Sequence, residues 1–427
     1  MTPVVVVGAG PVGLTAALLL ARAGVPSVVL EAADERAAVG SRSICVQRDV
    51  LDVLERVGVG RAVVAAGVTW YRGRTFHRGE EVLTTEFPES VDDDFPPFVN
   101  TPQTVVEELL ERRVRESPLV DLRCGSAVTG LVQDEHGVHV STATGTVDGT
   151  HCVAADGARS TVRHLLGISF DGCSFDDRFL IADIAVDLHD GPPERHFHFD
   201  PPWNPGRQVL LHPQPGGVWR VDWQVAEGVE LTEDHVRAVV GDRPFEVVWH
   251  STYRFHQRRA GTLLRGRVLL AGDAAHVMSP FGARGLNSGI CDADNAAWKI
   301  AFDRAGQAGP RLLASYDLER GAAADENLRV TGETMRFLVP RTPEERARRE
   351  TALATRRNID SGRLFTPFAY AGSPLTTPGC DGGLQPNSRW CGPDFSALPD
   401  GTLLRPDGHR AARTGTPAAH RRATGWP

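Results

Sequence analysis

The first residues able to do chemistry form a glycine-rich turn near the start of the chain. Gly8, Gly10 and Gly13 have the spacing Gly-x-Gly-x-x-Gly, with Pro11 and Val12 between the last two. The first glycine would permit a tight turn, the second would let the backbone approach a pyrophosphate, and the third would let a helix pack closely on a strand. The anion would then lie on the N-terminus of that helix. The spacing therefore predicts a dinucleotide-binding turn.

The elements that must position this turn surround it in the sequence. Residues 4–7 form a β-branched run typical of a buried parallel strand, and residues 14–23 have an apolar helical pattern. A second strand is expected over residues 27–30 and ends in Glu31, whose carboxylate would accept hydrogen bonds from the adenosine ribose hydroxyls. Together these elements predict nucleotide binding, but they do not separate NAD from FAD.

Two later segments carry further motifs. Residues 152–155 are strand-like and lead into Asp156-Gly157, and residues 268–271 are a buried strand that leads into Gly272-Asp273. An acid at the carboxyl end of a buried strand in a doubly wound sheet lies at the ligand crevice. Asp273 is therefore a candidate nucleotide ligand, with the formation of a helix N-cap as the alternative.

With these motifs in order over residues 3–340, the sequence resembles the p-hydroxybenzoate hydroxylase family of class A flavoprotein monooxygenases. It is most similar to the branch of 3-(3-hydroxyphenyl)propionate and polyketide hydroxylases. The resemblance implies tightly bound, noncovalent FAD and a transient NAD(P)H. By family position, Asp273 would form a hydrogen bond with the ribityl chain of FAD, and Asp156 would lie near the pyrophosphate. Arg42 would lie near the phosphates and the moving flavin, and Gln103 would lie beside FAD. The alternative for Asp156 is that it only caps a turn. The alternative for Arg42 is that it is only a solvated surface charge.

The loop over residues 280–289 is where the resemblance places the flavin ring. Its end coincides with a helix N-terminus at Gly285, Leu286 and Asn287, where free N–H groups suit a flavin edge that becomes anionic on reduction. Pro280 would leave the flavin face uncluttered for oxygen. Arg284 either binds substrate or pairs with a surface acid.

The rest of the chain predicts an α/β fold with two sheets and a tail. Short alternating runs between residues 170 and 267 are typical of an antiparallel sheet, in which His212 and Tyr253 are candidates to help deprotonate a phenol. Past residue 340 we expect one charged helix and then a tail that is loosely packed or partly wrapped over the surface, so that deletion after Thr377 would leave FAD binding intact. The predicted units are a discontinuous Rossmann-like FAD-binding domain (1–70, 100–170 and 266–335), a substrate domain (71–99 and 171–265), and a C-terminal helix with an irregular tail and no thioredoxin-like domain (336–427).

Composition excludes several classes of protein. The chain has 427 residues and a formal charge of −8, which gives no attraction to nucleic acid or anionic membrane. Glycines and a proline interrupt its uncharged N-terminal stretch, so a membrane helix is not expected. Seven cysteines without a Cys-x-x-Cys pair favour a reducing cytoplasm and no metal site. A monomer or homodimer is expected.

The resulting hypothesis is an FAD-dependent monooxygenase that uses NAD(P)H and O2 to hydroxylate a phenolic small molecule through a C4a-hydroperoxyflavin. It would act in natural-product biosynthesis or aromatic catabolism. One alternative is a family member that performs epoxidation, Baeyer-Villiger or decarboxylative oxygenation. Another is a catalytically silent protein that binds flavin and an aromatic metabolite.

Overall fold

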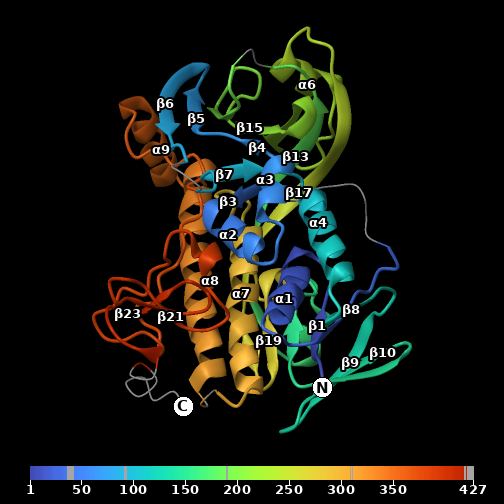
Figure 1. Ribbon diagram of the computed structural model, residues 1–427. Helices are drawn as coiled ribbons and strands as arrows, with labels where there is room; N and C mark the ends of the chain where they lie inside the picture. Colours follow the sequence, from blue (N-terminus) through green and yellow to red (C-terminus); the bar gives the residue numbers. More distant parts are fainter. Residues whose placement is uncertain are drawn as a thin grey trace.

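The computed structural model describes residues 1–35, 43–90, 94–188, 191–307, 309, 311–417 and 420. Its central sheet (Figure 1) has six strands in the order β18 (Leu264–Arg265), β19 (Val268–Leu270), β12 (Cys152–Ala154), β1 (Val4–Val7), β2 (Ser27–Leu30) and β8 (Val120–Arg123). All neighbouring strands are parallel except β18 and β19. Strands β19, β12, β1 and β2 are buried throughout because both faces of the sheet are covered, as their apolar runs predict.

Helices cover one side of this sheet. Helix α1 (Pro11–Arg22) contacts α4 (Gln103–Glu116) and α7 (Arg284–Arg304), and α8 (Arg311–Leu338) packs on α7. Helix α1 begins earlier than the predicted residue 14, because Pro11 at the first helical position has a backbone angle suited to a helix start. The remaining elements near this sheet are β9 (Val128–Gln133), β10 (Val138–Thr142), β11 (Gly145–Gly149) and α5 (Thr161–Leu165). Among the described residues, no helix combines the length and apolar character needed to cross a bilayer.

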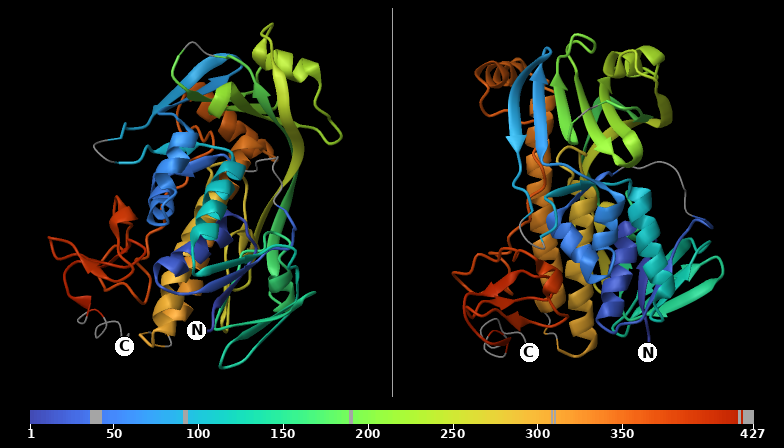
Figure 2. Two further views of the ribbon diagram at one scale, coloured as in Figure 1. Left: turned by 45° about the vertical axis from the view of Figure 1, so that its right-hand side comes forward. Right: turned by 45° about the horizontal axis from the view of Figure 1, so that its top comes forward.

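The second large sheet has eight strands and confirms the predicted antiparallel region. Its order is β20 (His276–Val277), β17 (Glu246–Ala260), β13 (Phe170–Ala185), β16 (Val218–Val225), β15 (Gln208–Gln214), β14 (Glu194–Phe199), β5 (Arg72–His77) and β6 (Glu80–Glu86). Only the β14–β5 pair is parallel among these described strands. The long strands β13 and β17 descend from this sheet toward the central one (Figure 2). The exact domain boundaries stay a prediction.

The two faces of the eight-stranded sheet differ in what covers them. Helix α6 (Glu233–Val240) covers the outer face, where Trp219 and Trp223, four residues apart on one strand, pack in an apolar cluster. The opposite side is the inner face of the sheet. This inner face packs against Phe281, in the segment that leads to α7.

A small third sheet contacts strand β15 of the eight-stranded sheet and helix α7. It contains β3 (Cys45–Gln47), β7 (Phe98–Asn100) and β4 (Val68–Thr69), with α2 (Arg48–Arg56) and α3 (Gly60–Ala66) in the connection between β3 and β4. The Asn100 side chain accepts a hydrogen bond from the Trp70 indole at 3.0 Å and donates to the Pro213 carbonyl oxygen at 2.9 Å. The second of these bonds joins the third sheet to strand β15.

The described part of the C-terminal segment packs against the rest of the protein, so the expected loose packing is wrong there and the alternative, a tail wrapped over the surface, is closer to the structure. After α9 (Pro343–Thr355), three short strands form a further sheet, namely β21 (Ser396–Ala397), β22 (Leu403–Leu404) and β23 (Arg410–Ala412). Leu403, Arg405 and Ala411 are fully buried. In Figures 1 and 2 the segment lies beside the lower part of α8. The sequence did not reveal this because the segment has no periodic apolar stripe: scattered apolar residues such as Leu375 and Phe395, together with buried charges, hold it to the helices.

A buried cluster of charges holds the C-terminal segment to the helices. Glu319 of α8 lies 2.7 Å from the Lys299 ammonium of α7 and 2.7 Å from the Arg405 guanidinium, which also binds Asp407 at 2.6 Å. Burial alone would raise the pKa of Glu319, but the charges of Arg405 and Lys299 hold it well below its ordinary value. These side chains are almost inaccessible to water, so each charge depends on its partners.

Candidate active site

The turn between β1 and α1 has the geometry that its glycines predict. Gly8 has a φ of +99°, and a Cβ atom there would lie 2.5 Å from the carbonyl oxygen of Ala155. A Cβ atom on Gly13 would lie 2.0 Å from the carbonyl oxygen of Gly8. A Cβ atom on Gly10, by contrast, would have no atom beyond its own chain neighbours within 4 Å. The first and third glycines are therefore required by packing, whereas the second faces open space at the start of α1.

Two acids flank this turn. The Glu31 carboxylate accepts hydrogen bonds from the backbone N–H of Ala9 at 2.7 Å and of Ala33 at 3.0 Å. Asp156 accepts from the Ser160 hydroxyl at 2.5 Å and from the N–H of Val162 at 3.0 Å, so it caps the turn before α5. The structure thus places Glu31 at the glycine turn. Asp156 makes the contacts of a turn cap, which was the alternative to its predicted role near the pyrophosphate.

The third motif meets the first at Val12. A Cβ atom on Gly272 would lie 3.0 Å from Val12 Cγ2, and one on Gly289 would lie 2.7 Å from the same atom. Gly272 also donates its N–H to Asp292 at 2.9 Å. The exposed Asp273 follows directly, in the short helix η2 (Gly272–Ala274). Segments that lie some 260 residues apart in the sequence are therefore packed together at one end of the central sheet.

The loop before α7 has an unusual backbone. Gly282 has a φ of +99°, and Ala283 adopts the left-handed conformation with a φ of 53°. Helix α7 then begins at Arg284 without a side-chain cap, and Pro280 is exposed. Space is open where a Cβ atom of Gly285 would lie. The N-terminus of α7 is therefore accessible beside Leu286, which is half-buried.

Asn287 has a structural role that the sequence did not reveal. Its side chain donates to the carbonyl oxygens of Cys45 at 3.0 Å and Ala283 at 2.6 Å, and it accepts from the N–H of Gln47 at 3.1 Å. Asn287 therefore joins strand β3 to the first turn of α7. Its predicted contact with the cofactor stays a prediction.

Gln103 and Arg42 belong to the same neighbourhood. Gln103 begins α4; its N–H donates to the Ser43 carbonyl oxygen at 3.2 Å, and its side chain donates to Glu107 at 2.8 Å. Arg42 itself lies outside the described residues. The structure thus places Gln103 next to the residue that follows Arg42, and both proposed roles stay predictions.

Arg284 has partners other than a surface acid. It is buried, with its guanidinium donating to the Asn327 side chain at 2.7 Å and to the Leu364 carbonyl oxygen at 3.3 Å. Burial, with the nearby charge of Arg363, lowers the pKa of Arg284 to about 10. Arg284 therefore ties the start of α7 to α8 and to the segment around residue 364. Its pairing with a surface acid was a wrong expectation, whereas substrate binding stays a prediction.

His212 and Tyr253 lie on the inner face of the eight-stranded sheet. His212 is paired with Arg220 across strands β15 and β16, and Tyr253 is paired with Phe179 across β17 and β13. Burial lowers the pKa of His212 well below 6.5, and the charges of Arg195 and Arg220 lower it further. A neutral His212 can exchange hydrogen bonds with a phenol, but it is a poor base for retaining the phenol proton.

Two polar residues on this face were not predicted from the sequence as site residues. Asp222 is paired with Leu210, on the same side of the sheet as His212, and burial raises its pKa to about 7. Arg195 precedes Phe197 and Phe199 at the same alternation, so it shares their inner face. A charged residue in register with buried phenylalanines is the signal that could have identified Arg195.

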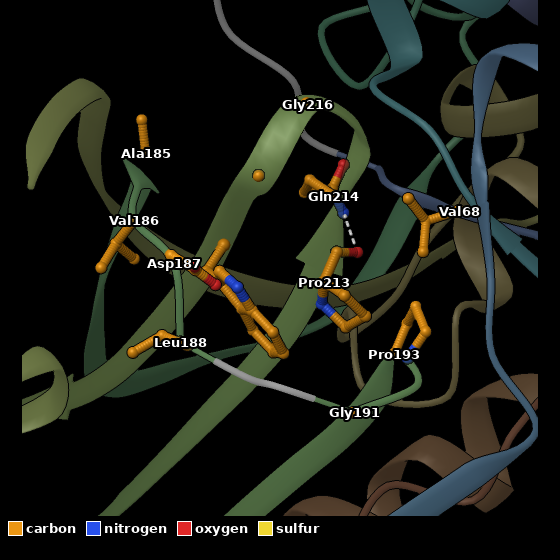
Figure 3. A pocket seen from close by; sticks show the side chains of 12 residues that line it. Val68, Ala185, Val186, Asp187, Leu188, Gly191, Pro193, Pro213, Gln214 and Gly216 are labelled. Carbon is orange, nitrogen blue, oxygen red and sulfur yellow. Dashed lines mark hydrogen bonds between the residues drawn. The ribbon is translucent and has the colours of Figure 1, made fainter.

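Two cavities adjoin the eight-stranded sheet. The first has a volume of about 510 Å³ and lies at the turn between β15 and β16 (Figure 3); Asp187 is its one charged lining residue among those described. The second has about 800 Å³ and lies between β6, α8, α9 and residues 357–364, with Arg195 in its wall. The second is larger and offers more polar groups, which suits an oriented small molecule. Among the described residues no cluster of His, Cys, Asp and Glu could hold a metal ion.

Together, the glycine turn and the two sheets define a nucleotide-binding α/β protein with an added antiparallel sheet. The sequence profile described as FAD binding domain matches residues 1–331, which is most of the chain. The protein therefore belongs to this FAD-binding family. The resemblance noted from the motifs is confirmed, as is the predicted α/β fold.

Two similar proteins are an aromatic hydroxylase and an aromatic monooxygenase by name. A 3-(3-hydroxy-phenyl)propionate/3-hydroxycinnamic acid hydroxylase of Mycobacterium avium is 33% identical over 342 residues, covering 75% of this chain and 58% of that protein. A para-nitrophenol 4-monooxygenase of Pseudomonas sp. is 32% identical over 342 residues, covering 74% and 82% of the two chains. The chain thus spans little more than half the length of the Mycobacterium avium hydroxylase.

Solved structures share the fold. The p-nitrophenol 4-monooxygenase of Pseudomonas putida matches with a TM-score of 0.73 at 28% identity, over 84% of this chain and 94% of that one. A flavin-dependent monooxygenase solved with FAD and substrate matches with a TM-score of 0.81 at 22% identity, over 100% and 99% of the two chains. The latter similarity concerns the fold alone.

Proposed function

We propose that this protein is an FAD-dependent monooxygenase that uses NAD(P)H and O2 to hydroxylate a phenolic small molecule. The relatives named above act on such aromatic compounds, which supports the substrate class.

The contrast between its glycines is the observation that carries the proposal. Packing requires Gly8, Gly13 and Gly289, because a Cβ atom on any of them would overlap a neighbouring atom. Packing does not require Gly10 or Gly285, since open space surrounds both Cβ positions. Both of these lie at or near the start of a helix, where backbone N–H groups can bind an anion. The residues present therefore fit FAD, with its pyrophosphate at α1 and its ring at α7.

The roles of the protein's own groups follow from this placement. Glu31 would bind the ribose hydroxyls of FAD, Asp273 the ribityl chain, and the first turn of α7 the edge of the ring. When bound, FAD supplies the redox chemistry that connects NAD(P)H to O2. The phenylalanines of the inner face exclude water from the reacting ring, while the neutral His212 offers a hydrogen bond to a phenolic hydroxyl.

The cellular setting belongs to the same proposal. All seven cysteines are free, which supports a reducing cytoplasm. We propose a monomer or homodimer that binds the aromatic substrate, O2 and NAD(P)H, and neither nucleic acid nor membrane; the formal charge of −8 supports the last point.

Cofactor content and product analysis test this proposal. The purified protein should be yellow with one FAD per chain, and Asp273→Ala should weaken FAD binding about tenfold to a hundredfold, because a hydrogen bond from the ligand to a charged group is lost. In isotopically labelled dioxygen, the product of an accepted phenol should carry one labelled oxygen atom. A colourless protein that cannot be reconstituted with FAD would contradict the proposal.

A further inference from the structure

Arg195 is a buried cation without a matching anion. Only 7% of its surface is exposed, yet none of the described residues forms an ion pair with it. Its two terminal nitrogens lie 3.4 Å from the Gly362 carbonyl oxygen and 3.4 Å from the Ser361 hydroxyl. The buried Nε atom has no hydrogen-bond partner among the described residues. These contacts are longer and weaker than the hydrogen bonds that a buried guanidinium normally makes.

Arg220 shows how the same sheet satisfies a buried arginine. It lies on the inner face as well, and its Nε and a terminal nitrogen donate to the two oxygens of Asp183 at 2.8 and 2.7 Å. Arg195 has no such carboxylate among the described residues. Because an unpaired buried charge is costly, natural chains keep one mainly where a ligand or a partner supplies the missing charge.

The cavity beside Arg195 is positively charged. Its volume is about 800 Å³, and three further arginines line it with two acids, namely Arg348, Arg357, Arg363, Glu333 and Asp360. Both acids already have donors: Glu333 binds Arg329 at 2.7 Å, and Asp360 binds the Thr334 hydroxyl at 3.0 Å. The cavity therefore presents more positive than negative charge to a small molecule inside it.

Aromatic side chains stand beside the guanidinium. The Arg195 guanidinium carbon lies 5.7 Å from the centroid of the Trp70 ring, which stacks on Phe98 at 5.0 Å and meets Phe87 edge-on at 5.7 Å. Phe87 and Leu364 also line the cavity. Ala283, in the loop before α7, packs against the same aromatic cluster. A ring bound here would have an aromatic wall on one side, and the loop assigned to the flavin would be close by.

We propose that Arg195 binds a negatively charged oxygen of the aromatic substrate, either a phenolate or a carboxylate. The oxygen would supply the acceptor that Arg195 lacks, while the aromatic cluster would receive the ring. This inference rests on the proposed function for the aromatic character of the substrate. It concerns ground-state binding, and it adds no chemical step to the reaction.

Binding measurements with four probes test the proposal. The anionic probes are 4-nitrophenol, at a pH where it is ionised, and 3-phenylpropionate; their neutral partners are 4-nitroanisole and 3-phenylpropanamide. Isothermal calorimetry on the protein as purified should show tighter binding of at least one anion than of its neutral partner. The anion that binds identifies the source, phenolate or carboxylate. Calorimetry does not depend on turnover, so it separates this proposal from the proposed function.

Variants then assign the effect to Arg195. Arg195→Met should weaken the preferred anion about tenfold to a hundredfold, because a charge-assisted hydrogen bond is lost, and should leave its neutral partner unchanged. Arg195→Lys should restore part of the affinity. The matched control is Arg74→Met, on the other face of the neighbouring strand, where Arg74 pairs with Glu194. Equal binding of all anions and neutral partners to the native protein would overturn the proposal, as would equal effects of the two methionine variants.

Thermal unfolding gives a second, ligand-free readout. If Arg195 is an unsatisfied charge kept for a ligand, Arg195→Met should retain or raise the Tm of the free protein. Arg220→Met should lower it, because Asp183 would lose its partner. A large fall in Tm for Arg195→Met, or a loss of FAD instead of anion affinity, would show a structural or cofactor role and would overturn the inference.

Discussion

The glycine turn around Val12 and the C-terminal segment around Arg405 are held in place by opposite means. At the turn, backbone atoms approach so closely that Gly8 and Gly13 have no room for a Cβ atom. In the C-terminal segment, long charged side chains reach across the interface, and Arg405 binds Glu319 and Asp407. Close backbone packing can be recognised from the sequence, because it requires glycines at a fixed local spacing. A buried ionic cluster cannot, because Lys299, Glu319 and Arg405 come from three separate segments of the chain and each resembles a surface residue.

Truncation should show the largest difference between the two regions. Deletion after Thr377 removes Arg389 and Arg405, which leaves Asp52 and Glu319 buried without those partners. We now expect loss of soluble, FAD-loaded protein, the reverse of the expectation from the sequence alone. Soluble yield and flavin absorbance measure this, with the full chain prepared in parallel. A soluble yellow truncated protein would show that the ionic cluster is dispensable.

Single alanines should separate the structural glycines from the ligand-facing one. Gly13→Ala forces a Cβ atom against the Gly8 carbonyl oxygen and should lower the free energy of unfolding by about 3 kcal/mol or more. Gly10→Ala has space for its Cβ atom and should keep the fold while weakening FAD binding. Denaturant unfolding and FAD titration of both variants test this. Similar stability losses in the two would contradict the assignment.

The ionic cluster should respond to the loss of one charge. Arg405→Met leaves Glu319 and Asp407 without their shared partner and should cost about 3 to 5 kcal/mol of unfolding free energy. The control is Arg410→Met in strand β23, which breaks an exposed pair with Asp381 and should cost about 1 kcal/mol or less. Urea unfolding compares the two variants. If both lose the same amount, then burial is not what makes the cluster important.

Acid should weaken the C-terminal segment through His409. Burial lowers the pKa of His409 from 6.5 to about 4, and its Nδ1 atom lies 2.9 Å from the Gly382 carbonyl oxygen. As the pH falls, the unfolded chain takes up a proton near pH 6.5, whereas the folded chain does so only near pH 4. The free energy of unfolding should therefore fall between these values, by about 3 kcal/mol in total.

Comparing two histidine variants isolates this effect. His409→Asn should flatten the pH dependence between pH 6.5 and 4, whereas the same change at the half-buried His139 of β10 should not. Unfolding by urea across this pH range is the measurement. An unchanged slope in His409→Asn would assign the acid sensitivity to another group.

Sequence reasoning reached those parts of the fold whose determinants are local. The strands at residues 4–7 and 27–30, the glycine turn and the antiparallel region follow from short-range patterns, and the structure confirms them. The partners of Arg284 and Asn287 could not be predicted, because they come from distant segments. Arg195 could have been noticed from its register with Phe197 and Phe199, but its long contacts with Ser361 and Gly362 come from a distant segment and appear only in the structure.

Lys299 gives the buried cluster a chemical reporter. It is the sole lysine in the sequence, and its ammonium group is inaccessible in the folded protein. An amine-directed acylating reagent should therefore modify this side chain only when α7, α8 and the C-terminal segment separate. The rate of acylation at Lys299, followed by peptide mass mapping, would time the opening of that interface without any engineered label.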